Sequence, residues 1–172
     1  MRVRLWQDPS SQILYSIDPR PIERDAGGEA NPAFQALPTS VSVRASLREP
    51  AYDVAPWAIN ADGHRARLEG WVPSAGGLNV DLHNLVHVWI GGDMGPGTSP
   101  NDPAFFLNHC NVDRIWEAWQ VDRGRNYSPG PGEGPALHRL DSAMFTLIGT
   151  GRTPSDVLNP DEWYEYDSLM VA

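Results

Sequence analysis

The chain has little cysteine, little positive charge and no long hydrophobic run. Cys110 is its only cysteine among 172 residues, so no disulfide can form within it. Cys110 directly follows His109 and could offer a thiolate ligand, but the favoured interpretation is a buried, inert thiol. No apolar run approaches the length of a membrane span, which argues against a membrane as partner.

The first residues, MRVRLWQDPSS, contain neither an apolar core of the signal-peptide type nor a matching cleavage site. Export by a signal of this chain is therefore not expected. The cellular location stays unknown, with the cytoplasm as the default expectation.

Basic residues are scarce: 13 Lys and Arg stand against 22 Asp and Glu, which gives a net charge of -9 and a pI near 4.8. An excess of negative charge disfavours binding to nucleic acid or to an anionic membrane surface.

The remaining composition is that of a globular protein, with 41% hydrophobic and 20% charged residues. The length suits one domain with a core of its own. Seven tryptophans and 16 each of glycine and proline predict a loop-rich protein with a few helices held by large aromatic side chains.

Three helices are predicted from capping signals and periodicity. Thr39 is the expected N-cap of a short helix that ends before Pro50. A second helix is expected over residues 80–90, ended by Gly91-Gly92. A third is expected from Pro103 to Gln120, with Asp102 as its N-cap. The segment 12–17 is a candidate strand, and 153–158 a helical turn.

His83 and His87 lie four positions apart, a spacing that puts both imidazoles on one face of a helix. His109 follows in the third predicted helix. Such a pair is weak evidence by itself, and HNLVH lacks the glutamate of zinc-peptidase helices. Together, three histidines on two facing helices indicate a nitrogen-only site for copper, zinc, iron or nickel.

The segments HNLVHVWIGGDM, SPNDPAFFLNH and VDRIWEAWQ resemble the second copper-binding half of the tyrosinase family, which includes catechol oxidases and is related to hemocyanins. The resemblance implies a mainly α fold, a di-copper helical bundle of which only the second helix pair is present, with long irregular loops. It implies that His83, His87 and His109 hold one copper ion per chain, of two in a complete enzyme.

The resemblance also implies roles for two polar residues. Glu69 in LEGW and Asn84, directly after the first histidine, match the family's glutamate and asparagine that orient a water to deprotonate a monophenol. Residues 72–80, VPSAGGLNV, form a longer insertion. If this loop bulges outward, Glu69 keeps its place; otherwise Glu69 is a solvated surface carboxylate. Asn108 replaces the first histidine of the family's His-His pair and is expected to widen the approach to the metal.

The chain lacks the family's earlier histidine trio, because only His64 and His138 remain and neither is expected to be a ligand. We therefore expect residues 1–172 to be a single partial copper-binding domain, with an irregular wrapping segment at 1–36 and a family-matching core at 37–167. A complementary chain carrying the first copper site is a candidate partner.

Two functions follow from these expectations. The chain is either half of an oxidoreductase that acts on monophenols or o-diphenols with dioxygen, or a non-catalytic single-copper module or assembly partner. Asp113, one turn after His109, is expected to hold a ligand imidazole or an arginine, and Arg114 to pair with Glu117 or Asp113. Residues 163–167 resemble the tyrosine motif that closes the family's catalytic core.

Overall fold

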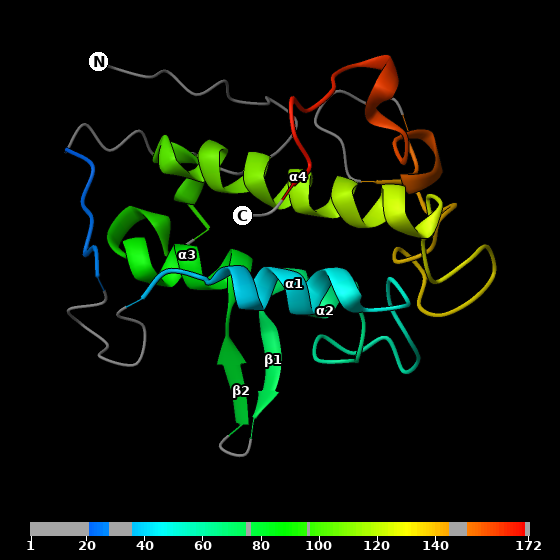
Figure 1. Ribbon diagram of the computed structural model, residues 1–172, viewed down its shortest axis with the longest axis horizontal. Helices are drawn as coiled ribbons and strands as arrows, with labels where there is room; N and C mark the ends of the chain where they lie inside the picture. The colour runs from blue at the N-terminus through cyan, green and yellow to red at the C-terminus, as the bar shows by residue number, and fades with distance from the viewer. Residues whose placement is uncertain (1–20, 28–35, 75–76, 96, 145–150, 171–172) are drawn as a thin grey trace, which may run out of the picture.

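The computed structural model describes residues 21–27, 36–74, 77–95, 97–144 and 151–170, and this part of the chain is mainly helical, as predicted (Figure 1). The elements are α1 (Ser40–Arg48), α2 (His64–Glu69), β1 (Trp71–Ser74), β2 (Gly77–Val80), α3 (Leu82–Ile90), η2 (Gly92–Met94), η3 (Ser99–Asn101), α4 (Ala104–Arg123), η4 (Pro154–Asp156) and η5 (Pro160–Glu162). The candidate strand at 12–17 lies outside the described residues. In the described part, no helix combines the length and apolar character that crossing a membrane requires.

The long helix α4 runs across the molecule, and α1, α2 and α3 lie along one side of it (Figure 1). The core cluster takes one buried residue each from α2, α3 and α4: Leu68, Leu82 and Ile115. Partly buried residues pack against this cluster, among them Val43 and Leu47 of α1, so all four helices contribute to it. Burial of these side chains therefore fixes the helices relative to one another.

Helix α1 begins as predicted, because the Thr39 side chain accepts a hydrogen bond from the backbone N–H of Ser42. Its carboxyl end is held by α4. The indole of Trp119 donates to the Glu49 carbonyl at 2.8 Å, and the Arg123 guanidinium donates to the Leu47 carbonyl at 3.3 Å. These bonds satisfy carbonyls that a helix end leaves without partners.

The predicted bounds of the two longer helices need small corrections. Helix α3 begins at Leu82 rather than at 80, because Val80 belongs to β2 and the Asp81 carboxylate caps the helix by accepting from the Leu82 N–H. Helix α4 begins at Ala104 and continues to Arg123, three residues beyond the predicted end. The N-cap is Pro103, one residue after the predicted Asp102, but the Asp102 carboxylate still accepts from the Ala104 N–H at 2.8 Å and so holds the first turn.

The insertion at 72–80 is not a loop but an antiparallel hairpin of β1 and β2, paired from Trp71 and Val80 to Ser74 and Gly77. It projects from the helices in Figure 1. Gly70 allows its base to close, because a Cβ there would lie 1.8 Å from the Asp81 carbonyl oxygen. The hairpin thus joins the end of α2 directly to the start of α3.

His64 is completely buried and is not part of the group of histidines that could hold a metal ion. Its ring stacks on Trp119 with centroids 4.7 Å apart, and Nδ1 donates to the Ser46 carbonyl at 3.0 Å. Burial lowers the pKa of His64 from 6.5 to about 4, because the imidazolium would lose its hydration.

This burial predicts a stability loss in mild acid. The folded pKa of His64 is below the unfolded value, so its contribution is complete above pH 6.5 and is lost as the pH falls toward 4. The shift corresponds to about 3 kcal/mol of unfolding free energy. Urea unfolding of wild type and His64→Phe, compared at pH 7.5 and 4.5, should show a smaller acid loss in the variant. The exposed His138 is the control, since His138→Phe should keep the wild-type pH dependence. An equal acid loss in wild type and His64→Phe would contradict this assignment.

Candidate metal centre

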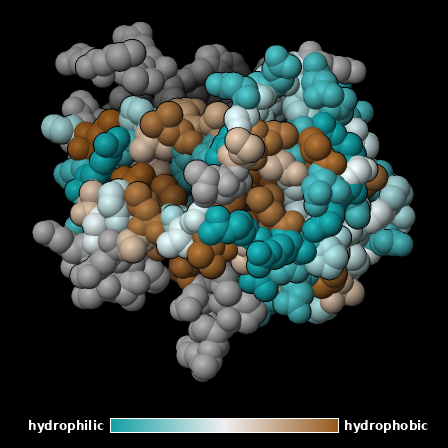
Figure 2. All heavy atoms as spheres, in the orientation of Figure 1, coloured by the Kyte–Doolittle hydropathy of each residue, from teal (hydrophilic) through white to brown (hydrophobic). Residues whose placement is uncertain are grey.

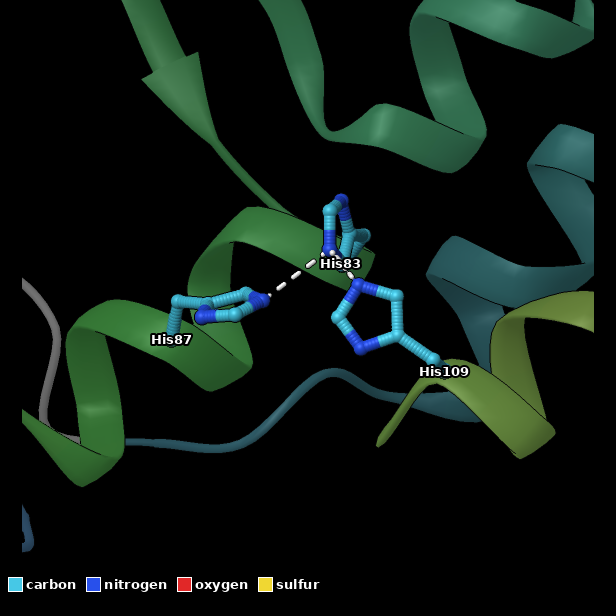
Figure 3. A group of neighbouring side chains, drawn as sticks. All are labelled: His83, His87 and His109. Carbon is cyan, nitrogen blue, oxygen red and sulfur yellow. Dashed lines mark hydrogen bonds between the residues drawn. The ribbon is translucent and has the colours of Figure 1, made fainter. Parts of the chain in front are cut away.

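The three histidines predicted as ligands converge on one point (Figure 3). His83 and His87 come from α3, and His109 comes from the second turn of α4. The Nε2 atom of His83 lies 3.0 Å from Nε2 of His87 and 3.0 Å from Nε2 of His109. Among the described residues, these three form the group whose ligand atoms lie close enough to share a metal ion, all within 4.8 Å of one another.

The other ring nitrogen of each histidine faces an oxygen. Nδ1 of His83 lies 2.8 Å from the Glu69 carboxylate. Nδ1 of His87 lies 2.7 Å from the Met94 carbonyl, and Nδ1 of His109 lies 2.8 Å from the Phe105 carbonyl. A carbonyl can only accept, and so can an ionised carboxylate, so each Nδ1 carries the proton. Each Nε2 therefore presents a lone pair to the centre.

Three lone pairs at this distance repel one another unless a cation or a shared proton lies between them. Metal–imidazole bonds of about 2.0–2.1 Å set ligand nitrogen atoms about 3.3–3.4 Å apart in a tetrahedral arrangement, so a small outward movement admits an ion. A set of neutral imidazoles suits copper, zinc, nickel or iron and not magnesium or calcium. The residues present thus fit copper.

His109 is suited to stay neutral. Burial, the largest cause, lowers its pKa, and the neighbouring imidazoles lower it further, against the opposing effect of the Phe105 carbonyl. Its ring also stacks on the Phe105 ring with centroids 3.8 Å apart. A neutral ring in a fixed orientation is the form that binds a metal.

Glu69 lies at the end of α2, beside the start of α3. The hydrogen bond from His83 is the main cause that lowers the pKa of Glu69, so its carboxylate stays ionised. Its side chain is 44% exposed. Asn84 is half-buried next to His83 on α3, and its amide makes no hydrogen bond with the described residues. With the hairpin projecting from the helices, the Glu69 carboxylate lies against Nδ1 of His83.

Sequence reasoning missed the acceptors of two imidazoles, because backbone carbonyls leave no residue-specific signal. In the loop after α3, Gly92–Met94 and Ser99–Asn101 form two 3-10 turns, and the Met94 side chain is fully buried. The glycines that end α3 were the one hint that this loop approaches other backbone closely.

Three expectations about α4 were wrong. Asp113 holds neither an imidazole nor an arginine: it accepts hydrogen bonds from the hydroxyls of Tyr164 and Tyr166, within the predicted tyrosine motif. Arg114 donates to the Asn111 side chain and to carbonyls of the same C-terminal segment, not to Glu117 or Asp113. Cys110 is exposed rather than buried.

Asn108 is buried against α3, beside the backbone of His83. It is 7% exposed, and its amide donates to the His83 carbonyl at 3.4 Å. It lines an apolar groove of about 230 Å³ between α1, α3 and α4, whose walls include Leu37, Val43, Leu82, Val86 and Val112. The exposed His138 and the buried His64 take no part in the site, as expected.

Comparison with known proteins gives one consistent result. Residues 11–122 match the common central domain of tyrosinase. The tyrosinases of Streptomyces lincolnensis and Streptomyces glaucescens are 40% and 41% identical over 157 residues, 91% of this chain and 53% of each relative. Grixazone synthase of Streptomyces griseus is 34% identical over 176 residues, 94% of this chain and 54% of that protein. The chain spans about half the length of these curated relatives.

The geometry predicts one tight metal site per chain. Titration of the purified chain with Cu(II), followed by competition with a chromophoric chelator, should give one equivalent bound. His87→Ala should weaken binding by at least tenfold, because two nitrogen ligands hold a divalent ion less well than three. His138→Ala is the matched control and should leave the affinity unchanged. Two bound equivalents, or equal losses in both variants, would contradict the assigned ligand set.

Proposed function

This chain belongs to the tyrosinase family, and on that basis we propose that it is the copper-binding half of a phenol oxidoreductase. Its substrates would be monophenols, o-diphenols or both, with dioxygen as the oxidant. One observation carries the proposal: three imidazoles on α3 and α4 direct their Nε2 atoms at one point while each Nδ1 is held by an oxygen.

His83, His87 and His109 would hold one copper ion through Nε2. When bound, copper supplies the one-electron redox chemistry that oxidation of a phenol by dioxygen requires. The protein residues orient the ligands. Glu69, the Met94 carbonyl and the Phe105 carbonyl fix the tautomer and the direction of the three rings.

Glu69 and Asn84 are proposed to handle the substrate proton. A phenol has a pKa of about 10 and has to lose its proton to bind a metal as phenolate, so a positioned acceptor helps. The partly exposed, ionised Glu69 can orient a water toward the metal while it still accepts from His83. The half-buried amide of Asn84, which directly follows His83 on α3, can donate to or accept from that water.

A complementary polypeptide with the first copper site is the proposed partner, so residues 1–172 would be part of a larger catalytic domain. Figure 2 shows hydrophobic side chains gathered in the middle of the face seen in Figure 1. The first turns of α4 expose 62% of Phe106 and 76% of Leu107. The chain's coverage of 53% of its relatives supports a partner that supplies the remaining helices.

The alternative is a single-copper module without turnover. One observation favours it: among the described residues, the histidine trio is the group able to hold a metal ion. A chain that binds one copper and does not oxidise phenols under any condition below would have this function.

The first functional prediction is complementation. The chain with Cu(II) should oxidise an o-diphenol such as catechol only after a polypeptide with the first histidine trio is added. Quinone formation, followed by absorbance, measures the reaction, and His109→Ala with the same added polypeptide is the control. Oxidation at equal rates with and without the added polypeptide would disprove the half-site proposal, and no oxidation in either case would support the single-copper module.

The second functional prediction concerns Glu69. Glu69→Gln keeps an oxygen that can accept from His83 but removes the charge, so copper affinity should fall by about tenfold or less. Oxidation of a monophenol should fall further than that of an o-diphenol in the complemented protein, because the monophenol depends more on a positioned proton acceptor. Glu49→Gln, whose carboxylate pairs with Arg67 away from the histidines, is the control. Equal losses for both substrate types would argue that Glu69 only orients His83.

A further inference from the structure

The segment Pro21–Gly27, here called the strap, crosses the end of α3 and the loop that follows it (Figure 1, blue). Its backbone donates from Asp25 to the Ile90 carbonyl at 2.8 Å and from Gly27 to the Trp89 carbonyl at 3.0 Å. Glu23 and Asp93 are joined twice: the Asp93 N–H donates to the Glu23 carbonyl, and the Glu23 N–H donates to the Asp93 carboxylate. Four hydrogen bonds therefore join the strap to residues 89–93, at the end of α3 and the start of the loop.

The contact is close enough to require glycine on the loop. A Cβ at Gly92 would lie 2.2 Å from the Glu23 carbonyl oxygen, and one at Gly91 would lie 2.9 Å from the Asp25 Cβ. Both glycines also have a positive φ, +62° at Gly91 and +51° at Gly92. The pair that ends α3 thus also admits the strap.

Arg24 extends from the strap to the start of α4. Its Nε donates to one oxygen of Asp102 at 2.8 Å and its Nη2 to the other at 2.6 Å, a two-point contact across 78 positions. Asp102 is completely buried. The hydrogen bond from Arg24 is the main cause that lowers the pKa of Asp102, so an ionised carboxylate is held inside the protein. The same carboxylate accepts from the Ala104 N–H and so holds the first turn of α4.

Two of the three imidazole acceptors lie on the backbone close to these contacts. Met94 follows the glycines bonded to the strap, and its carbonyl accepts from His87. Phe105 follows Asp102, donates its N–H to the Asp102 carbonyl and accepts from His109 through its own carbonyl. Movement of the loop or of the first turn of α4 would shift the acceptor of one ring or the other.

We infer that Arg24 is a positioning residue for the metal centre. Through Asp102 and the strap it sets where the Met94 and Phe105 carbonyls stand, and hence how His87 and His109 point. The inference rests on the proposed metal-binding function. Residues 1–36 were expected only to wrap the domain, and Arg24 lies 59 positions before the first proposed ligand.

The test compares two arginine–carboxylate pairs on α4. Arg24→Lys keeps the charge but loses the two-point contact, and Cu(II) affinity should fall about tenfold, the low end for partners of metal ligands. Arg125→Lys alters the Arg125–Glu117 pair at the far end of α4, where Glu117 is also buried, and should change the affinity less than twofold. If Arg24→Lys does not fold, Asp93→Asn replaces it as a milder change on the loop side of the strap. Its loss of Cu(II) affinity should lie between about twofold and tenfold.

A second readout needs no metal. In ¹H–¹⁵N spectra of the metal-free chain, the Nδ1–H signals of His87 and His109 should broaden or shift in Arg24→Lys and stay in place in Arg125→Lys. The His83 signal, held by Glu69 on α2, should change least. Unchanged affinity and ring signals in both Arg24→Lys and Asp93→Asn would overturn the inference, as would equal losses in Arg125→Lys. A wild-type chain that binds no Cu(II) would instead overturn the proposed function.

Discussion

The structure depends on one constraint: three imidazoles have to present their Nε2 atoms to one point, so each Nδ1 needs a fixed oxygen behind it. The three oxygens come from different parts of the chain. Glu69 ends α2, the Met94 carbonyl lies in the loop after α3, and the Phe105 carbonyl lies in the first turn of α4. The core of Leu68, Leu82 and Ile115 joins those same three helices. The packing of α2, α3 and α4 against one another thus also sets the positions of the three ligand rings.

Arginine–carboxylate pairs connect distant segments of this chain, as disulfides do in other loop-rich proteins. Every one of the 13 Lys and Arg positions is an arginine, and among the described residues four of them pair with carboxylates at least eight positions away. The pairs are Arg24–Asp102, Arg65–Asp53, Arg67–Glu49 and Arg125–Glu117. A planar guanidinium can hold a carboxylate at two points, which a lysine ammonium cannot do. Arg24 holds Asp102 in this way, so direction as well as charge fixes the strap against the start of α4.

Much of the site could be predicted from the sequence, because its signals are local. Each of these signals spans only a few neighbouring residues: the spacing of His83 and His87, the capping carboxylate of Asp102, and the glycines after α3. What could not be predicted depends on distant contacts. The partners of Asp113 lie 51 and 53 positions away, and the exposure of Cys110 depends on how distant segments pack around α4. The hairpin at 71–80 was missed because alternation over four-residue strands is too short to distinguish from a loop.

Two of the three oxygens behind the ligands are main-chain carbonyls, and this determines how the site tolerates genetic change. A carbonyl is the same for every amino acid, so replacing Met94 or Phe105 leaves the acceptor itself present and tests only the packing of the side chain. Adding or deleting one residue between His87 and Met94, or between Phe105 and His109, would instead move a carbonyl relative to the ring that it holds. These two short segments should therefore vary in sequence among homologues more readily than in length.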